Sequence, residues 1–367
     1  MMVPFLDLKA ANESVRAQID AAIGRVLDSG WLIGGPEVES FEGMFATFCQ
    51  AEHCVGVGNG LDALHLLLRA AGIGPGDEVI VASNTFIATW LAVDMVGATP
   101  VPVEPDAATH NLDSALVEAA ITQRTRAVLV THLYGQPADL DPLLQLCRAR
   151  GLKLFEDAAQ AHGARYKGRP LGGHSDGVAW SFYPSKNLGA LGDGGAVTCN
   201  DAQLAARVRA LGNYGSERRY VNIERGVNSR LDPIHAAAMA VKLPLLDAWN
   251  DHRRSIAALY LDGLAGTAVT LPHVPDWADP VWHLFVIRTK NRENLQAHLA
   301  SRDIQTLIHY PIPPHRQQAY ADSPAANAQL PIAEQLASEV LSLPIGPQLH
   351  PDQAQAVIAA VRDWSPA

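Results

Sequence analysis

Short apolar runs rich in β-branched residues alternate with helix-like segments between about residues 55 and 200. Among the helix-like segments are 61–71, with apolar residues at 61, 64, 67, 68 and 71, and 141–150. Such alternation is typical of βαβ units and predicts a mostly parallel sheet with helices on both faces. The predicted strands are 78–81, 99–103, 127–130, 152–155, 177–180 and 196–198.

The pattern changes near Pro233, where a proline opens an Ala- and Leu-rich segment that runs to Leu264. Proline is common in the first turn of a helix, and this segment is predicted to be the arm that leads into a second, smaller α/β domain. The first 30 residues carry apolar side chains at helical spacing and predict an amphipathic helical segment. In the second domain we expect a strand at 282–287 and helices at 293–301 and 351–364. The predicted division is a helical segment 1–30, a large domain 31–245 and a small domain 246–367.

The composition of the chain limits which kinds of binding partner are expected. The chain of 367 residues has 38 acidic and 28 basic side chains and a net charge of −10, and no basic cluster alternates with aromatics, so nucleic acid is not an expected partner. It has no signal-like amino terminus and no run of 18 apolar residues, so we expect no membrane association and a cytoplasmic location. The four cysteines lack Cys-x-x-Cys spacing and the histidines lack a metal-binding pattern, so free thiols and no metal are expected.

One of the six lysines has an unusual position. Lys186 lies between the apolar run that ends at Ser181 and the glycine cluster 192–195, whereas the other five have charged, glycine-rich or loop-like neighbours or lie in a polar helix. Partial desolvation lowers the pKa of a lysine and frees its amine to form a Schiff base. Position alone leaves a structural lysine with a solvated amine as an equal alternative.

Ligands of open parallel sheets bind beyond the carboxyl ends of the strands, so the residues there are candidates. The glycine-rich turn 57–64 opens a helix whose free amides favour a phosphate, and Ser181 could join that site. Glu156 and Asp157 end another strand and face opposite sides, so only one can face a ligand; a helix-capping role is the alternative. A phosphate turn, a carboxylate and a lysine together are what pyridoxal 5′-phosphate (PLP) requires.

Several motifs occur in an order that resembles one family, the DegT/DnrJ/StrS sugar aminotransferases, which have the aspartate-aminotransferase-like fold of fold type I PLP enzymes. The resemblance covers nearly the whole chain, and it implies a PLP-binding large domain and a smaller carboxyl-terminal α/β domain. Some relatives carry histidine in place of the lysine and act as dehydratases, so Lys186 implies amino transfer. The matching segments are 58–64, 84–89, 156–163, 181–186, 192–195 and 226–232.

The resemblance implies a role for individual residues. Lys186 would form the internal aldimine, Asp157 would pair with the pyridine nitrogen, and Gln160 would lie near the phenolic oxygen of the cofactor. Phe86 would stack on the ring, and Asn228 would reach in from the second subunit of a homodimer with its active site at the interface. Without the family, Phe86 reads most simply as a core aromatic and Asn228 as a loop residue. The phosphate would be held by Gly60, Leu61 and Ser181.

The finer resemblance is to the branch that aminates C3 of dTDP-linked 3-keto-6-deoxyhexoses, with an amino acid, most plausibly glutamate, as donor. Such an enzyme would make an amino sugar for a surface polysaccharide or a natural product. Alternatives are amination at C4, another enzyme of the same fold such as a lyase or an amino acid aminotransferase, and a non-catalytic PLP-binding regulator. Residues expected to contact the sugar substrate are Tyr183, Tyr214, His309 and His315, although two exposed turn histidines would also explain the last two.

Overall fold

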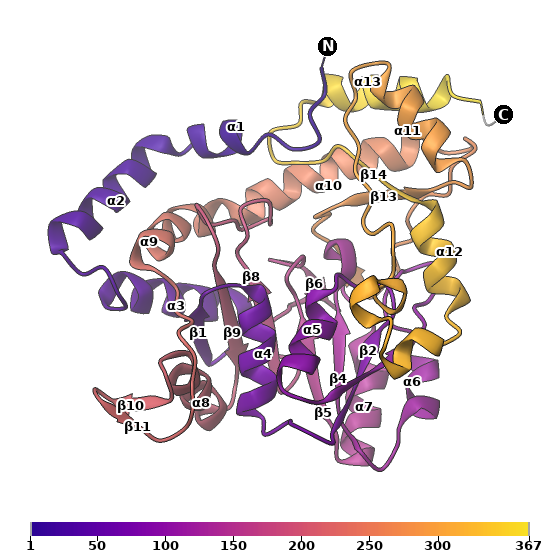
Figure 1. Cartoon of the computed structure of the whole chain (residues 1–367). Helices are drawn as coiled ribbons and strands as arrows, with labels where there is room; N and C mark the ends of the chain where they lie inside the picture. The colour runs from indigo at the N-terminus through magenta and orange to yellow at the C-terminus, as the bar shows by residue number, and fades with distance from the viewer. Residues whose placement is uncertain (1, 366–367) are drawn as a thin grey trace.

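The computed structural model describes residues 2–365 and contains a seven-stranded sheet in the order β1-β9-β8-β5-β4-β2-β3 (Figure 1). Neighbouring strands are parallel except β9, which runs antiparallel to both β1 and β8. The α/β fold class is confirmed. The strands are β1 (His53–Val57), β2 (Glu78–Ala82), β3 (Thr99–Val103), β4 (Thr125–Thr131), β5 (Lys153–Asp157), β8 (Gly177–Ser181) and β9 (Gly195–Cys199).

All six strands predicted in this region form, and β1 was missed because its apolar run is short and ends in a glycine turn. The antiparallel direction of β9 follows from the connection that precedes it. The connection between β8 and β9, residues 182–194, contains no crossover helix, so the chain turns back beside the strand it has just left. Lys186 lies in this connection.

The sheet is covered by helices on both faces. Along β2, Ile80 and Ala82 pack in one apolar cluster and Val79 and Val81 in another, as the alternation of a strand requires. The first cluster includes residues from α3 (Pro36–Cys49), α6 (Ser114–Ala120) and α7 (Leu140–Arg150). The second includes residues from α4 (Gly60–Ala70), α5 (Ala88–Met95) and α8 (Ala202–Gly212).

The Ala- and Leu-rich arm from Pro233 to Leu264 is helical but not continuous. The structure has α9 (Pro233–Lys242), a 3-10 turn η2 (Leu243–Leu245) and α10 (Leu246–Gly263). Pro244 lies in the 3-10 turn, and proline has no backbone N–H for an α-helical hydrogen bond, which explains the break.

The carboxyl-terminal region has its own buried core, which joins α10 to the antiparallel pair β13 (Phe285–Arg288) and β14 (Val340–Leu343) and to the helices α11 (Arg292–Ala300) and α13 (Pro351–Arg362). Val3 lies in this core and forms a parallel bridge to Ile304, so the amino-terminal segment begins beside this region (Figure 1). The predicted boundary at 245/246 stays a prediction.

The amino-terminal segment contains two helices, α1 (Leu8–Glu13) and α2 (Arg16–Ser29), of which α2 packs on α9. No helix within residues 2–365 is long and apolar enough to cross a bilayer. The remaining elements are β6 (Arg165–Tyr166), β7 (Arg169–Pro170), β10 (Ser216–Arg218), β11 (Val221–Asn222), β12 (Ala278–Asp279), α12 (Pro331–Glu339), η1 (Leu133–Gly135), η3 (Pro314–Arg316), η4 (Gln318–Tyr320) and η5 (Pro324–Asn327).

Candidate active site

The central predicted residues lie at one edge of the sheet. Asp157 is the last residue of β5, Ser181 is the last residue of the parallel neighbour β8, and Lys186 follows in the loop after β8. Both strands end at the same edge because they are parallel. The structure therefore brings together side chains that come from separate segments of the sequence.

The amine of Lys186 is desolvated and unpaired. Within residues 2–365 its side chain makes no hydrogen bond or ion pair, although its backbone N–H donates to the carbonyl of Tyr183 at 2.8 Å. Burial lowers the pKa of Lys186 to about 8, and the charge of Asp157 partly opposes that shift. A large fraction of the amine is consequently neutral, and therefore nucleophilic, at moderately alkaline pH.

Asp157 is buried and oriented by two donors. The hydroxyl of Thr89, in the first turn of α5, donates to Oδ2 at 2.8 Å, and the backbone N–H of Ala159 donates to Oδ1 at 3.1 Å. Burial raises the pKa of Asp157, while Thr89, Ala159 and Lys186 oppose that rise. Burying a charged carboxylate without an ion pair is costly, so a cationic group on a ligand would stabilise the ionised form of Asp157. The role of Thr89 was missed, although Thr89 ends one of the motifs quoted above.

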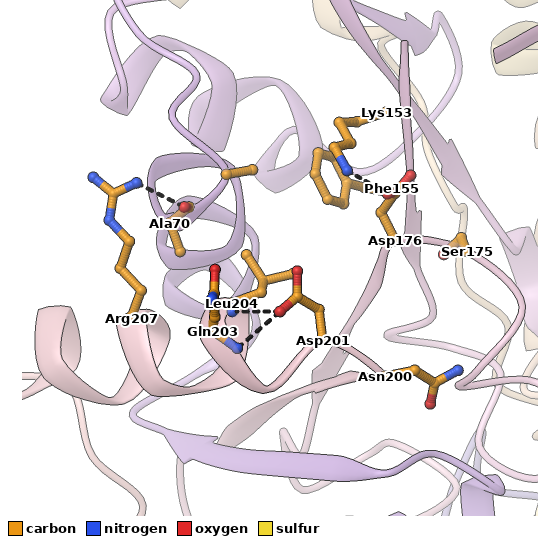
Figure 2. Close-up of a pocket in the computed structure, with 11 residues that line it drawn as sticks. Ala70, Lys153, Phe155, Ser175, Asp176, Asn200, Asp201, Gln203, Leu204 and Arg207 are labelled. Carbon is orange, nitrogen blue, oxygen red and sulfur yellow. Dashed lines mark hydrogen bonds and ion pairs between the residues drawn. The ribbon is translucent and has the colours of Figure 1, made fainter. Parts of the chain in front are cut away.

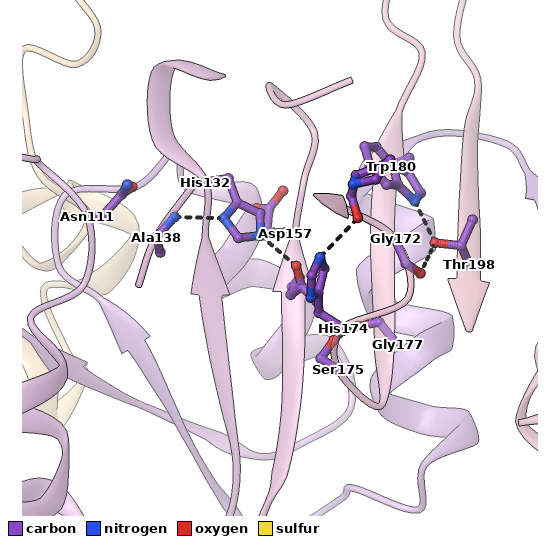
Figure 3. A network of polar contacts seen from close by, with 12 residues as sticks. Asn111, His132, Ala138, Asp157, Gly172, His174, Ser175, Gly177, Trp180 and Thr198 are labelled. Atoms are coloured by element: carbon purple, nitrogen blue, oxygen red, sulfur yellow. Dashed lines mark hydrogen bonds and ion pairs between the residues drawn. The ribbon is translucent and has the colours of Figure 1, made fainter. Parts of the chain in front are cut away.

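Glu156 lies on the other side of β5, as strand alternation predicts, and its partner is His132. The ring Nδ1 of His132 accepts a hydrogen bond from the N–H of Ala138 at 3.0 Å (Figure 3). Nε2 therefore carries the proton and donates to Glu156 at 2.7 Å. Burial raises the pKa of Glu156, but the hydrogen bonds from His132 and Ser175 help to outweigh it, and that pKa lies below its ordinary value. Glu156 thus has a bonded partner inside the protein, whereas Asp157 forms no ion pair within residues 2–365, although the charge of Lys186 acts on it.

The turn before α4 fits a phosphate. The Asn59 side chain caps the helix by accepting from the N–H of Asp62 at 2.8 Å, while the amides of Gly60 and Leu61 take part in no hydrogen bond among the described residues. A Cβ on Gly60 would lie only 2.6 Å from the Cβ of Ser181, so glycine is what permits this contact. Two free amides, a helix dipole and a serine hydroxyl at one point form a cradle for an anion.

The candidate site also includes two aromatic rings and the side-chain amide of Gln160. Phe86, which follows β2, is 52% exposed, so the reading as a core aromatic is wrong, and its ring centroid lies 5.3 Å from that of Tyr310. The amide of Gln160 accepts from the N–H of Tyr134 at 2.6 Å and donates to the hydroxyl of Tyr310 at 3.1 Å. Tyr310, which no sequence argument singled out, comes from the carboxyl-terminal region.

The two candidate histidines differ. His309 is half-buried, with Nδ1 bonded to the hydroxyl of Ser342 at 2.8 Å, and burial followed by the charge of Lys186 lowers its pKa to about 4. His315 is buried and its Nε2 contacts Glu334 at 3.1 Å. Neither is the exposed turn histidine considered as the alternative. The charge of Lys186 reaches His309.

The other candidates are exposed. Tyr183 lies in the loop of Lys186 with 54% of its surface exposed, and Tyr214 is 51% exposed with the guanidinium of Arg230 over its ring. Asn228 is exposed and forms a backbone bridge to Asn213. The next residue, Ser229, accepts from the N–H of Gly58 at 2.9 Å and so ties this segment to the phosphate turn. Within residues 2–365 none of these side chains forms a hydrogen bond to the Lys186 amine.

A cavity of about 530 Å³ lies at the opposite edge of the sheet, where β5 and β8 begin. There the side chain of Lys153 is bonded to Asp176 at 2.7 Å (Figure 2). Arg207 donates to the carbonyl of Ala70 at 2.8 Å and pairs with Glu224. The charged groups of this cavity are already satisfied by the protein, so it is a poor candidate for the chemistry.

An unpaired amine of low pKa, a buried carboxylate without a cation, and free amides at a helix start fit the aldehyde, ring nitrogen and phosphate of PLP. These are the requirements of a PLP-dependent aminotransferase on an aspartate-aminotransferase-like fold. More narrowly, the chain belongs to the DegT/DnrJ/EryC1/StrS aminotransferase family, whose model matches residues 13–362. The cofactor of this family is PLP, and a solved relative carries the cofactor as PMP.

Individual relatives cover almost the entire chain. A dTDP-3-amino-3,4,6-trideoxy-alpha-D-glucose transaminase of Streptomyces venezuelae is 57% identical over 99% of this chain and 96% of its own length. The erythromycin biosynthesis sensory transduction protein EryC1 of Saccharopolyspora erythraea is 56% identical over 99% of both chains. The solved structure of S. venezuelae DesV in complex with a ketimine intermediate has a TM-score of 0.98 and 56% identity, and it covers 99% of this chain and 98% of that chain.

Proposed function

We propose that this enzyme transfers an amino group from an amino acid, most plausibly glutamate, to C3 of a dTDP-linked 3-keto-6-deoxyhexose. The observation that carries the proposal is the desolvated, unpaired Lys186 amine within reach of the charge of Asp157. The transaminase named for a dTDP-3-amino sugar supports the substrate class, since 57% of residues are identical over 99% of this chain. The product would serve a surface polysaccharide or a natural product.

The protein groups have distinct tasks. Bound PLP supplies an electron-withdrawing ring that stabilises negative charge at the carbon being deprotonated. Asp157 keeps the ring nitrogen protonated, and Thr89 and Ala159 hold the carboxylate in place. The amine of Lys186 holds the cofactor at rest and, once released, carries a proton to and from the reacting carbon. Phe86 would cover the ring, Gln160 would lie near the phenolic oxygen, and Gly60, Leu61 and Ser181 would hold the phosphate.

The active form is proposed to be a homodimer in which Asn228 of one subunit completes the site of the other. Its exposure in the single chain supports this, because an exposed amide in a segment tied to the phosphate turn is available to a second chain. Tyr183, Tyr214, His309 and His315 are the proposed contacts to the sugar nucleotide. A cytoplasmic location and the absence of nucleic-acid and membrane partners stay predictions.

Stepwise half-reactions test the proposal. Glutamate should remove the absorbance of the Lys186-linked cofactor, and a dTDP-3-keto-6-deoxyhexose should restore it and yield a 3-amino sugar, identified by NMR of the product. Restoration by a simple keto acid but by no sugar nucleotide would indicate an amino acid aminotransferase. An amine at C4 would contradict the assigned branch.

A regulatory role is the second candidate, favoured by the name of the relative called a sensory transduction protein. A sensor needs to bind a ligand but needs no nucleophilic amine. Burial lowers the pKa of both Lys186 and Lys242 to about 8, but the Lys242 amine donates to the carbonyl of Gly189, whereas the Lys186 amine has no partner within residues 2–365. The unpaired amine of Lys186 is therefore better explained by catalysis. Absence of any spectral change with every amino donor, in a protein that binds PLP, would favour the regulator.

A further inference from the structure

The loop that carries Lys186 is closed at its base by backbone bonds, yet the lysine side chain itself has no partner within residues 2–365. The N–H of Ala190 donates to the carbonyl of Phe182 at 2.8 Å, and Phe182 in turn donates to Gly194 at 2.7 Å. These bonds fix the ends of the loop but not its position above the sheet. The position of the Lys186 amine must therefore be set by the residues next to it.

The neighbouring residue, Asn187, is buried and its side-chain amide is fully engaged. Its Nδ2 donates to Oδ1 of Asn250 and to the carbonyl of Val281, both at 2.9 Å. Its Oδ1 accepts from Nδ1 of His283 at 3.1 Å. One side chain thus joins the lysine loop to α10 and to the segment before β13.

Asn250 makes a second connection. Its Nδ2 donates to the carbonyl of His162 at 2.9 Å, in the segment that follows Asp157. A Cβ on Gly163 would lie 2.8 Å from that nitrogen, so the glycine leaves room for the contact. Asn250 is completely buried, which makes each of its bonds costly to lose. A single amide therefore links the segment of Asp157 to the loop of Lys186.

The same helix is anchored one turn later by Arg253. Its buried guanidinium donates to the carbonyls of Trp282 at 3.1 Å, Ile345 at 3.3 Å and His283 at 3.4 Å. Asn250 is consequently held on a helix that is itself fixed to the segments beside the site, which makes it a rigid reference point for the loop.

We infer that Asn250 is a positioning residue for Lys186, acting through Asn187 to fix the amine relative to Asp157. The inference rests on the proposed function for the role of Lys186. It follows from the two bonds of the Asn250 amide, one to each segment. Misplacement of a reacting group by about 1 Å can reduce a rate by about 10²-fold.

A double-mutant cycle tests this in the PLP-loaded enzyme. Asn250→Leu and Asn187→Leu should each lower kcat by about 10- to 100-fold. The double variant should have about the same kcat as the less active single variant, because both substitutions break the same link between Asn187 and Asn250. The pH midpoint of the absorbance of the Lys186-linked cofactor should move in the same variants. Tyr260→Phe is the matched control, since it removes a buried hydrogen bond from the same helix to Pro344; it should leave kcat and the midpoint unchanged.

Asn250→Asp covers the case in which Asn250→Leu does not fold. Its carboxyl can still accept from Asn187, so it should retain more of kcat than Asn187→Leu. Unchanged kcat and midpoint in a folded Asn250 variant, or additive losses in the cycle, would overturn the inference. The midpoint requires no sugar substrate, so it separates a failure of this inference from a failure of the proposed activity.

Discussion

Each of the two edges of the sheet carries a lysine and an aspartate, but the two side chains are bonded to each other at one edge and not at the other. At the amino edge, Lys153 opens β5 and its amine bonds to Asp176, just before β8, at 2.7 Å, with both side chains partly exposed. At the carboxyl edge, Asp157 ends β5 and Lys186 follows β8, but the two are not bonded to each other. The first pair is satisfied and inert. The second leaves an amine and a carboxylate available to a ligand, so pairing and solvation, rather than residue type, distinguish the reactive edge.

Removal of each lysine should give the largest contrast between the edges. Lys186→Ala is expected to lower kcat by at least about 10⁴-fold, because it removes the amine that we propose both holds the cofactor and acts as the base. Lys153→Ala, the matched control, removes a surface ion pair worth at most about 1 kcal/mol and should leave kcat unchanged. Steady-state kinetics with glutamate and the sugar nucleotide measure both. Near wild-type turnover by Lys186→Ala would show that the unpaired amine at the carboxyl edge is not required for the reaction.

The replacement of Asp157 should have the next largest effect. Asp157→Asn is expected to lower kcat by about 10²- to 10³-fold, since it removes the charge that keeps the ring nitrogen protonated. Burial raises the pKa of Asp157 in the folded protein without cofactor, so its ionised form costs stability above that pKa and the variant should not melt earlier than wild type.

Glu156→Gln is the matched control for Asp157→Asn, on the opposite side of the same strand. The pKa of Glu156 is held low, so its charge stabilises the fold above its unfolded pKa, and the loss appears as pH falls through the folded pKa. The variant should therefore lose about 1–3 kcal/mol of stability at neutral pH and little activity. Thermal unfolding and kcat together separate the two carboxylates; an equal loss of rate in both variants would refute the distinction.

The reactivity of Lys186 in the cofactor-free protein should depend on pH in a defined direction. Because its pKa is lowered to about 8, labelling of its amine by a reductive methylation reagent should be half-maximal near pH 8, against about 10.4 for an ordinary lysine. In Asp157→Asn the midpoint should fall further, since the carboxylate charge opposes the shift. Mass spectrometry of the labelled peptide gives the midpoint, and an ordinary value would mean that the amine is solvated.

The close contact between Gly60 and Ser181 at the phosphate turn can be tested by adding a single methyl group. Gly60→Ala places a Cβ 2.6 Å from that of Ser181, so the cofactor Kd should rise by about 10- to 100-fold. Gly24→Ala in α2 meets no atom within 4 Å and should instead stabilise the protein by about 0.5–1 kcal/mol. Fluorescence titration with PLP measures the first effect and thermal unfolding the second. Unchanged cofactor affinity in Gly60→Ala would place the phosphate elsewhere.

Local sequence patterns were sufficient to predict most of the sheet and its two central residues. The strands are runs of adjacent apolar residues, and Lys186 and Asp157 follow directly from the ends of such runs. The break at Pro244 is a local feature of the same kind, since proline cannot donate an α-helical hydrogen bond.

Contacts between distant segments could not be predicted in the same way. Thr89 reaches Asp157 across 68 positions, and Asn250 reaches Asn187 across 63. Tyr310 reaches Gln160 across 150 positions. No spacing rule connects such pairs, because their approach depends on how helices pack on the sheet. The groups that orient the reactive residues therefore emerge only from the folded structure.

We propose that the unpaired amine at the carboxyl edge is the one that holds the cofactor. Reduction of the PLP-loaded enzyme with borohydride, followed by digestion and tandem mass spectrometry, locates the pyridoxyl group on a single side chain. We expect the label on Lys186 in stoichiometric amount. A label on Lys153, or on the buried Lys242, whose amine donates to the carbonyl of Gly189, would show that another lysine holds the cofactor.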